Sequence, residues 1–519
     1  MFIRKKNKLL NNSNLANFAF SKSIFFSLFS FITINSVIIL LHYSAMVKDV
    51  GTYDTAKFQY TGYTLGVPHT SGYPLYTLLS WVFTHLLPFG EIAWRQNVLN
   101  LLFSIITLNF LFLIFRHLKV GTFISILLVF VQSFSLTFWY ISFQAEVYSL
   151  HIMFISIIIF LLIKAIKTNE DNYIFGTLVV YGLMFSHHLT SICLFPGLLV
   201  FILYRNWRIL LEYKIYLFSV IGISLGLLPY LYIWIRFHAP NNVFVEMHVY
   251  DLNSFFNEIT GGEFQNDLFN INWNKLIIAQ LPMTYKFFKS GELGYLIFFG
   301  LFAFFNKKLR SLLFFIFLTI IINIYFAISF DVSDPWGYYT PIYFLLIILV
   351  GVGIQEFLNY IHERKSKYFL FSLIVISILL FGRGYKVYKN NSKRIATFTQ
   401  KEEIYRELSY KYLATLKSNC VFIITSDQAW QTMNYLMQIK KMNQGVILVP
   451  LLSPKATTKH IEDYMNGKSF YDRYFRYNVE PGLQVYINDS DWIRRFQNLG
   501  YAVKEGQNGL SILYLPKKR

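Results

Sequence analysis

Long apolar runs alternate with short polar segments over most of the chain. Lipid offers no partner to backbone polar groups, so an apolar run of about 18 residues or more predicts a transmembrane helix. We therefore predict a polytopic α-helical membrane protein. Its first run follows a cluster of Lys and Arg and has no small-residue cleavage site after it, which favours an uncleaved span. The pattern predicts about eleven spans, at 23–42, 94–116, 121–140, 147–166, 172–187, 189–204, 214–236, 293–306, 309–330, 341–360 and 367–383.

One further apolar segment, Tyr73 to Phe89, is too short to be counted as a span. It begins after Gly72 and reaches Pro88 at its end. We predict a helix that lies in or near the membrane interface.

The last part of the chain, residues 390–519, has the composition of a soluble domain. The run from Val421 predicts a strand, Trp430 to Lys441 a helix and Val446 to Pro450 a second strand, which together form a β-α-β unit. Gln484–Ile487 and Leu510–Tyr514 predict further strands. We predict a transmembrane domain at 1–389 and a small α/β domain at 390–519.

Charge orients the predicted spans. The net charge is +19, yet only 14% of the residues are charged. The Lys and Arg residues gather in short tracts between apolar runs, as the positive-inside rule describes, so we exclude a nucleic-acid-binding protein. The alternate short loops, around Gln144, around His187 and at 331–341, contain no Lys or Arg. With the N-terminus inside, the inner loops hold Arg116 and Lys119; Lys164 and Lys167; Arg205, Arg208 and Lys214; Lys307, Lys308 and Arg310; Arg364, Lys365 and Lys367.

An odd number of spans then places the C-terminal domain on the outer face. The bias toward Lys, Asn, Ile and Phe favours a prokaryotic plasma (inner) membrane, with the N-terminus cytoplasmic and the C-terminal domain extracytoplasmic. The two cysteines, Cys193 and Cys420, argue against a disulfide framework.

The predicted outer side collects residues that can perform chemistry. Ionisable groups at membrane depth are costly, so they tend to face a cavity and to be functional. Acids, histidines and an arginine on one face suit acid–base chemistry on a phosphate-bearing lipid. Each also has a simpler explanation as a helix cap, an interfacial anchor or a turn residue. The candidates are Asp54, Lys57, His69, Gln144, Glu146, Tyr148, His187, His188, Arg236 and Asp334.

These residues carry a resemblance to a known family. The chain resembles the membrane family called domain-of-unknown-function twenty-seven twenty-three, which is similar to protein O-mannosyltransferases and other glycosyltransferases of the C superfamily. The shared elements are Asp54 ahead of Phe58-Gln59, Tyr63-Thr-Leu-Gly66, His69-x-x-Gly72-Tyr-Pro74-Leu-Tyr, Leu87-Pro-Phe-Gly90, Trp94-Arg95, Asn97, Phe138-Trp139, Ala145-Glu146-Val-Tyr148-Ser149, His187-His188-Leu-Thr190, Leu231-Tyr, Arg236 and the loop from Asp334 to Pro341.

The resemblance implies an enzyme that takes a mannose-like sugar from a polyprenyl-phosphate donor and adds it to a hydroxyl of a protein or glycan on the outer face. The family's catalytic acid matches Asp54, which would act as the general base of an inverting displacement. Arg236 suits the leaving phosphate through paired hydrogen bonds. The other candidates would bind substrate.

Two positions depart from the family pattern. Lys57 stands where the family usually has Glu, and Thr70-Ser71 where it often has Pro-Pro. Lys57 removes a candidate second acid, which predicts phosphate binding by Lys57, an altered substrate or weak activity.

Two matters stay open at this point. Asp54, Glu146 and a histidine would suit a divalent ion, but the mannosyltransferases use none, so we predict no cofactor. The alternatives to the enzyme are a transporter or flippase of lipid-linked sugars, and a scaffold whose outer α/β domain binds a partner.

Overall fold

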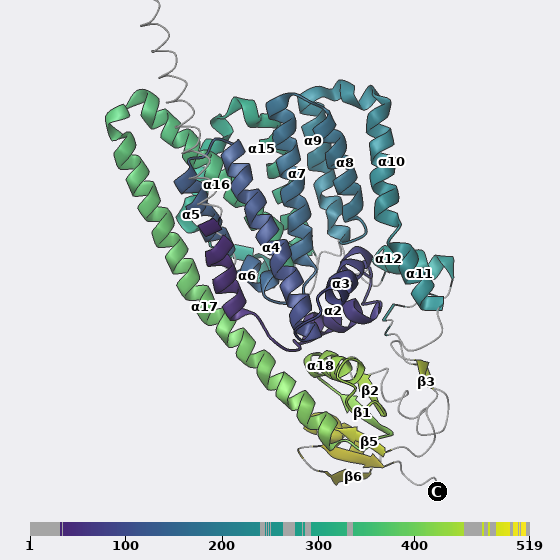
Figure 1. Cartoon of the computed structure of the whole chain (residues 1–519). Helices are drawn as coiled ribbons and strands as arrows, with labels where there is room; N and C mark the ends of the chain where they lie inside the picture. The colour runs from purple at the N-terminus through teal and green to yellow at the C-terminus, as the bar shows by residue number, and fades with distance from the viewer. Residues whose placement is uncertain are drawn as a thin grey trace, which may run out of the picture.

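Apolar helices packed side by side form one part of the molecule, and a small sheet lies beyond one end of them (Figure 1). Residues 35–45 are helical. This computed structural model describes residues 32–33, 35–238, 244, 246–247, 249, 251–262, 276–282, 284–285, 292–329, 336–450, 470–471, 476–477, 484–498, 502–506, 508 and 510–514.

Within these residues, seven helices are long and apolar enough to cross a membrane, or eight if a bent pair counts as one span. Two shorter apolar helices, α8 (Asn172–Met184) and η5 (Gly294–Phe305), stand where spans are predicted. Part of the predicted first span lies outside the described residues, so the total of eleven stays a prediction. The long spans are Ile92–His117, Tyr148–Thr168, Leu189–Leu211, Tyr213–His238, Lys307–Ser329, Gly337–Arg364 and Ser366–Thr415.

The predicted span at 121–140 is broken into two helices bent by 70°, α5 (Thr122–Ser133) and α6 (Leu136–Ser142), which together are apolar enough to count as one span. Side chains from elsewhere replace the backbone bonds lost at the break. Glu292 accepts from the Leu136 N–H, and Asn391 Nδ2 donates to the Phe134 carbonyl at 2.8 Å. A broken helix is tolerated at membrane depth when protein groups satisfy the freed backbone in this way.

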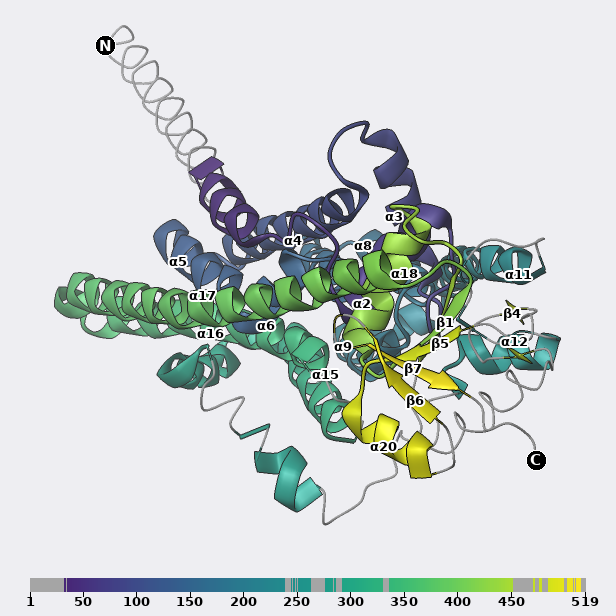
Figure 2. The same ribbon diagram turned by 90° about the horizontal axis from the view of Figure 1, so that it is seen from below.

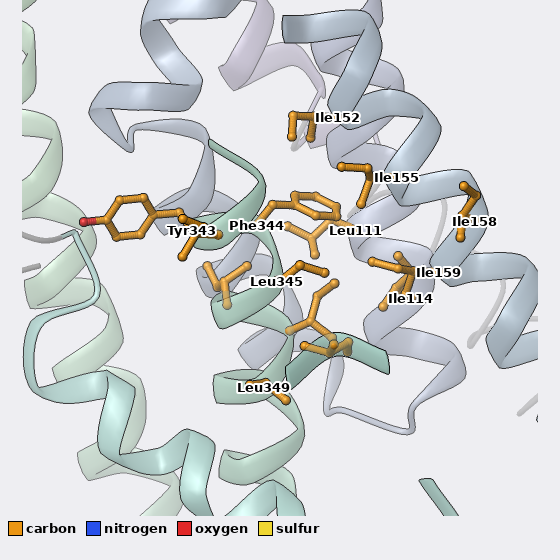
Figure 3. Packing of buried hydrophobic residues seen from close by; sticks show 14 of the residues in the cluster. Leu111, Ile114, Ile152, Ile155, Ile158, Ile159, Tyr343, Phe344, Leu345 and Leu349 are labelled. Carbon is orange, nitrogen blue, oxygen red and sulfur yellow. The ribbon is translucent and has the colours of Figure 1, made fainter. Parts of the chain in front are cut away.

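Side chains from three helices pack together in the middle of the bundle (Figure 3). Leu111 on α4 (Ile92–His117), Ile155 on α7 (Tyr148–Thr168) and Phe344 on α16 (Trp336–Arg364) are all fully buried. Inside a membrane such close packing, rather than escape from water, holds helices together.

A different contact joins α8 to α10 (Tyr213–Leu227). Their backbones meet at Gly182, Gly222 and Gly226. A Cβ at Gly226 would stand 2.1 Å from the Gly182 carbonyl oxygen, and one at Gly222 would stand 2.6 Å from the Leu178 oxygen. Gly222 and Gly226 are spaced as in the small-xxx-small pattern of closely packed membrane helices.

The predicted interfacial segment contains helix α3 (Pro74–Leu86), which begins at a proline. Together with α2 (Tyr53–Thr64) it lies at the end of the bundle that faces the sheet (Figure 1). Its exposed residues include Leu79, Trp81 and Val82, as expected for a helix at an interface.

Helix α17 (Phe369–Thr415) links the bundle to the sheet in one unbroken run of 47 residues (Figures 1 and 2). At 1.5 Å per residue it is about 70 Å long, which exceeds the thickness of a bilayer. It passes without a break through the predicted boundary at 389–390. The division into two domains at that point stays a prediction.

The sheet has the strand order β2-β1-β5-β7-β6. Strand β1 pairs in parallel with β2 and β5, while β7 pairs antiparallel with β5 and β6. The predicted β-α-β unit is present, with α18 (Asp427–Gln438) between β1 and β2. The strands are β1 (Cys420–Ile424), β2 (Val446–Pro450), β3 (Phe470–Tyr471), β4 (Arg476–Tyr477), β5 (Gln484–Ile487), β6 (Ala502–Glu505) and β7 (Ser511–Tyr514), and β3 and β4 form a separate pair.

The other helical elements among the described residues are η1 (Leu189–Leu194), α9 (Phe195–Asn206), η2 (Trp207–Leu211), α11 (Tyr230–His238), α12 (Leu252–Ile259), η4 (Leu276–Gln280), η6 (Lys307–Leu309), α15 (Arg310–Ser329), η7 (Ser366–Tyr368) and α20 (Ser490–Asn498).

Candidate active site

Asp54 lies in the first turn of α2, at the end of the bundle that faces the sheet. Its side chain is 48% exposed, whereas the eight residues that follow, Thr55 to Gly62, are all buried. The middle of the helix is therefore enclosed, while its first turn, which carries the carboxylate, and its last two residues are more open. The positive end of the helix dipole favours the ionised form of an acid at that position.

Lys57, one turn later, is the centre of a charged cluster. Its Nζ atom lies 3.2 Å from Asp54 Oδ1 and 3.1 Å from Glu246 Oε2. It is also 3.2 Å from Glu246 Oε1 and 3.2 Å from His69 Nδ1. An ammonium has three N–H groups, so two carboxylates and one imidazole use all of them. The Lys57 side chain is only 7% exposed, which keeps water from competing for these contacts.

The charges of the cluster shift one another's pKa values. Burial acts to raise the pKa of Asp54, but the charge and the hydrogen bond of Lys57 outweigh it and hold that pKa below its usual value. Burial likewise acts to lower the pKa of Lys57, but Glu246 and Asp54 outweigh it and raise that pKa. Asp54 and Lys57 are therefore both charged at neutral pH. Burial raises the pKa of Glu246 to about 7, against the opposing effect of Lys57.

His69 is placed by a tight turn. The Gly72 N–H donates to the His69 carbonyl at 2.8 Å. Gly72 has φ of +82°, and a Cβ there would meet Ile233 Cδ1 at 2.4 Å, so the turn requires glycine. This requirement explains the spacing of the His69-x-x-Gly72 motif. Burial, followed by the charge of Lys57, lowers the pKa of His69 to about 4.

The neutral His69 ring has one defined hydrogen-bonding arrangement. Because Nδ1 accepts from the Lys57 ammonium, the ring hydrogen lies on Nε2. That nitrogen stands 3.2 Å from the Tyr73 hydroxyl. The imidazole thus links the charged cluster to the aromatic side chains beyond it.

Glu246 reaches this cluster from a segment 189 residues away in sequence. Two backbone hydrogen bonds attach that segment to Val67, on the loop between α2 and α3. The Val67 N–H donates to the Phe244 carbonyl at 2.8 Å, and the Glu246 N–H donates to the Val67 carbonyl at 2.9 Å. Sequence analysis missed Glu246, because an isolated acid in a polar stretch gives no signal.

Glu146 lies beside the same turn of α2. Thr55 Oγ1 donates to Glu146 Oε1 at 3.5 Å. Asn100 Nδ2 fixes the loop by donating to the carbonyls of Gln144 and Glu146, both at 2.7 Å. The Gln144 side chain is fully buried, and its amide finds no hydrogen-bonding partner among the described residues.

His187 and His188 lie against aromatic rings at the ends of neighbouring helices. His187 Nε2 donates to the Val147 carbonyl at 2.7 Å, so this histidine holds the chain just before Tyr148. The His188 ring centre is 5.4 Å from that of Tyr148 and 5.6 Å from that of Tyr73. The cluster thereby extends from Asp54 through Lys57, His69 and Tyr73 to His188 and Tyr148.

One further histidine belongs to this group. The ring of His151 lies 5.3 Å from that of His188, and both its nitrogens lack a hydrogen-bonding partner among the described residues. Its signal in the sequence was its position on α7 one turn after Tyr148, which places both on one face.

Two predicted site residues lie elsewhere. Arg236 Nη2 donates to the carbonyl of Thr64 at 3.1 Å, at the last residue of α2. That residue is ten positions after Asp54, or about 15 Å along the helix. Asp334 lies outside the described residues.

Helix α18, which lies between β1 and β2 in the chain, contacts α2 directly. The Tyr60 hydroxyl donates to Gln431 Oε1 at 2.8 Å, and Thr432 Oγ1 donates to the Gly51 carbonyl at 3.0 Å, so α18 packs on the outer side of α2. From α17, Glu402 accepts from the Thr52 hydroxyl at 2.6 Å. The segment that carries Asp54 is therefore held between the bundle and the helices α17 and α18.

The arrangement suits proton transfer more than metal binding. The exposed Asp54 carboxylate can accept a proton, while Lys57 stabilises its negative charge. Among the described residues, no group of three or more His, Cys, Asp and Glu side chains is placed to hold a metal ion.

Known proteins share parts of this sequence. A family model described as the protein O-mannosyl-transferase TMEM260 N-terminal domain matches residues 54–210. The mouse protein O-mannosyl-transferase TMEM260 is 31% identical over 192 residues, which cover 35% of this chain and 26% of that protein. The Dictyostelium discoideum protein of the same name is 26% identical over 202 residues, covering 35% and 24%. The chain thus spans about a quarter of the length of the curated relatives it matches.

Solved structures share the fold over a longer stretch. ArnT from Cupriavidus metallidurans bound to undecaprenyl phosphate has a TM-score of 0.57 at 10% identity, covering 93% of this chain and 97% of that one. An Archaeoglobus fulgidus oligosaccharyltransferase in complex with Zn and sulfate has a TM-score of 0.50 at 10% identity, covering 88% and 68%. The chain therefore shares the helical membrane fold of these two proteins, which agrees with the predicted polytopic α-helical architecture.

The similarity to O-mannosyl-transferases confirms that part of the predicted resemblance. The matched segment begins at Asp54 and ends before Arg236 and Glu246. The name of the domain-of-unknown-function family stays a prediction.

Proposed function

We propose that this chain is a membrane glycosyltransferase that moves a mannose-like sugar from a polyprenyl-phosphate donor to an acceptor hydroxyl of a protein or glycan on the outer face. The observation that carries the proposal is the half-exposed Asp54 carboxylate, held by Lys57 at the open first turn of a largely buried helix. Two similarities support it. The segment that begins at Asp54 matches protein O-mannosyl-transferases, and the fold matches a protein bound to undecaprenyl phosphate.

The reaction is a single displacement. The acceptor oxygen attacks the anomeric carbon, and the bond from that carbon to the phosphate oxygen breaks, with its electron pair leaving on the lipid phosphate. Asp54 takes the acceptor's proton as the new bond forms. Attack opposite the leaving group inverts the anomeric carbon, and one base is sufficient.

The remaining candidates bind substrate in this proposal. The buried amide of Gln144 and the ring of His188 offer polar groups to sugar hydroxyls, with Glu146, Tyr148 and His187 around them. Asp334 would contact the acceptor, whereas Arg236, which bonds to the Thr64 carbonyl at the far end of α2, lies too far from Asp54 to hold the leaving phosphate beside it. We expect turnover to survive EDTA, because Asp54 Oδ1 already faces the Lys57 ammonium, a poor neighbour for a divalent cation.

The protein would work in a prokaryotic plasma membrane, with its N-terminus cytoplasmic and the sheet domain outside. The shared position of the sheet and of Asp54 at one end of the bundle supports placing both on one side (Figure 1).

Replacement of Asp54 by Asn tests the proposal. Purified protein in detergent is given polyprenyl-phosphate-mannose and related donors, and release of the lipid phosphate is measured together with labelling of acceptors. We expect Asp54→Asn to lose about a hundredfold or more of the turnover, the scale of a general base. Asp49→Asn is a matched control, since Asp49 lies just before α2 and accepts hydrogen bonds from the Val50 N–H and the Tyr410 hydroxyl instead.

Equal turnover in wild type and Asp54→Asn would refute the proposed role of Asp54. The transporter alternative has its own signature. Lipid-linked sugar would then cross liposomes equally well in both proteins, with no release of lipid phosphate.

A further inference from the structure

Lys57 has more negative neighbours than it can neutralise. Asp54 and Glu246 both contact its ammonium, and the charge of Asp427 on α18 also acts on it. His69 contributes no charge, because its pKa is lowered to about 4, chiefly by burial and then by Lys57. The two contacting carboxylates therefore compete for one cation.

Glu246 has the stronger position in this competition. Glu246 Oε1 accepts a hydrogen bond from Nζ at 3.2 Å and Oε2 forms an ion-pair contact with it at 3.1 Å, whereas Asp54 contacts Nζ through Oδ1 in an ion pair at 3.2 Å. The Glu246 side chain is 9% exposed and that of Asp54 is 48% exposed. Water screens the Asp54 contact more strongly than the Glu246 contact.

We infer that Glu246 is a positioning residue of this site: its carboxylate binds the Lys57 ammonium and so leaves the Asp54 carboxylate free to take a proton from the acceptor. The inference rests on the proposed function, because it assigns the base to Asp54. Glu246 itself acts only through Lys57.

The titratable groups around the Lys57–Glu246 pair come from three further places. Asp54 and Tyr60 lie on α2, His69 lies on the loop after α2, and Asp427 lies on α18. If the charge of Glu246 is removed, Asp54 must neutralise Lys57 alone. Its pKa then falls, and a weaker base takes the acceptor's proton less readily.

Protonation of Glu246 has the same effect as its removal. Burial raises the pKa of Glu246 to about 7, so acidification through neutral pH releases Lys57 onto Asp54 and slows the reaction. The acidic limb of the wild-type pH–rate profile should therefore lie near neutrality. Glu246→Gln deletes this titration, and the limb should move to lower pH while the plateau falls.

The test compares pH–rate profiles of the full-length protein with polyprenyl-phosphate-mannose as the donor. We expect Glu246→Gln to lower kcat about tenfold and to move the acidic limb down by about one pH unit or more, the scale of a neighbouring charge. Glu246→Asp keeps the charge and should recover most of the loss. Glu258→Gln is the matched control. Glu258 is a nearby acid that accepts from the Thr70 hydroxyl at 2.6 Å and has no contact with Lys57 among the residues that the structure describes, so this variant should keep the wild-type profile.

A charge exchange guards against misfolding of the single variant. Glu246→Lys places two cations beside Asp54 and should abolish turnover. Adding Lys57→Glu restores one cation and one further acid, so the double variant should be at least tenfold more active than Glu246→Lys, a coupling expected only of residues in contact.

The outcomes separate the two ideas. If Asp54→Asn keeps full turnover, the proposed function fails and the role of Glu246 fails with it. If Asp54→Asn is inactive while Glu246→Gln has the wild-type limb, only the inference is overturned. A uniform loss at every pH in Glu246→Gln, with no rescue by the charge exchange, would also overturn it, since that is the signature of misfolding.

Discussion

The glycine contact between α8 and α10 makes a sharp prediction about stability. We expect Gly226→Ala to separate these helices. The new Cβ would stand 2.1 Å from the Gly182 carbonyl oxygen and 3.0 Å from the Gly182 carbonyl carbon. Both are backbone atoms, so no side-chain rotation can relieve the clash, and the helices must move apart by more than 1 Å to reach ordinary contact.

The magnitude follows from the packing. Overpacking a close contact costs about 1–3 kcal/mol, and separation also loses the close approach that holds membrane helices together without a hydrophobic driving force. We therefore expect Gly226→Ala to lower the free energy of unfolding by about 2 kcal/mol. The assay is thermal or denaturant unfolding in detergent, followed by tryptophan fluorescence.

Gly176→Ala supplies the control on the same helix pair. A Cβ at Gly176, on α8, meets nothing closer than Leu161 Cδ1 at 3.9 Å. The substitution should be neutral or stabilise by up to about 1 kcal/mol, since alanine favours a helix over glycine. If Gly226→Ala unfolds together with Gly176→Ala, the close packing of α8 and α10 described above does not exist in solution.

Two further variants probe the surroundings of the candidate site. Tyr60→Phe removes the hydrogen bond to Gln431 and should weaken the packing of α18 on α2 by about 1–3 kcal/mol. Hydrogen exchange in α18 should then be roughly five- to 150-fold faster. Unchanged exchange would show that this hydrogen bond contributes nothing. Asn100→Leu leaves the carbonyls of Gln144 and Glu146 and the hydroxyl of Tyr76 without the Asn100 side chain as their partner. The free energy of unfolding should therefore fall by at least about 2 kcal/mol. A melting temperature equal to that of wild type would contradict a stabilising role of these three hydrogen bonds.

Hydropathy predicted the helices that run straight and stay apolar, such as α4 and α7. It did not detect the bend between α5 and α6, because residues 132–137 contain no Pro, Gly or charged residue to mark it, and the partners that satisfy the break, Glu292 and Asn391, are distant in sequence. It also ended α17 too early. The residues after 383 become polar, yet they continue the same helix toward the sheet.

The candidate site was predicted in part for a similar reason. Asp54, Lys57 and His69 lie close in sequence, and the structure brings them together. Glu246 was missed because its contact with Lys57 depends on backbone pairing between segments far apart in the chain. The distance from Asp54 to Arg236 depends on the direction of α2, which a linear pattern does not reveal.

The bond between Thr52 and Glu402 has a consequence for biosynthesis. The two residues are 350 positions apart, and a ribosome adding roughly 5–20 residues per second needs about 20–70 s to make the intervening chain. Through this interval the segment that bears Asp54 exists without Glu402, Gln431 or Thr432 to hold it. The turn that bears Asp54 would therefore acquire its full set of contacts only after α17 and α18 have been synthesised.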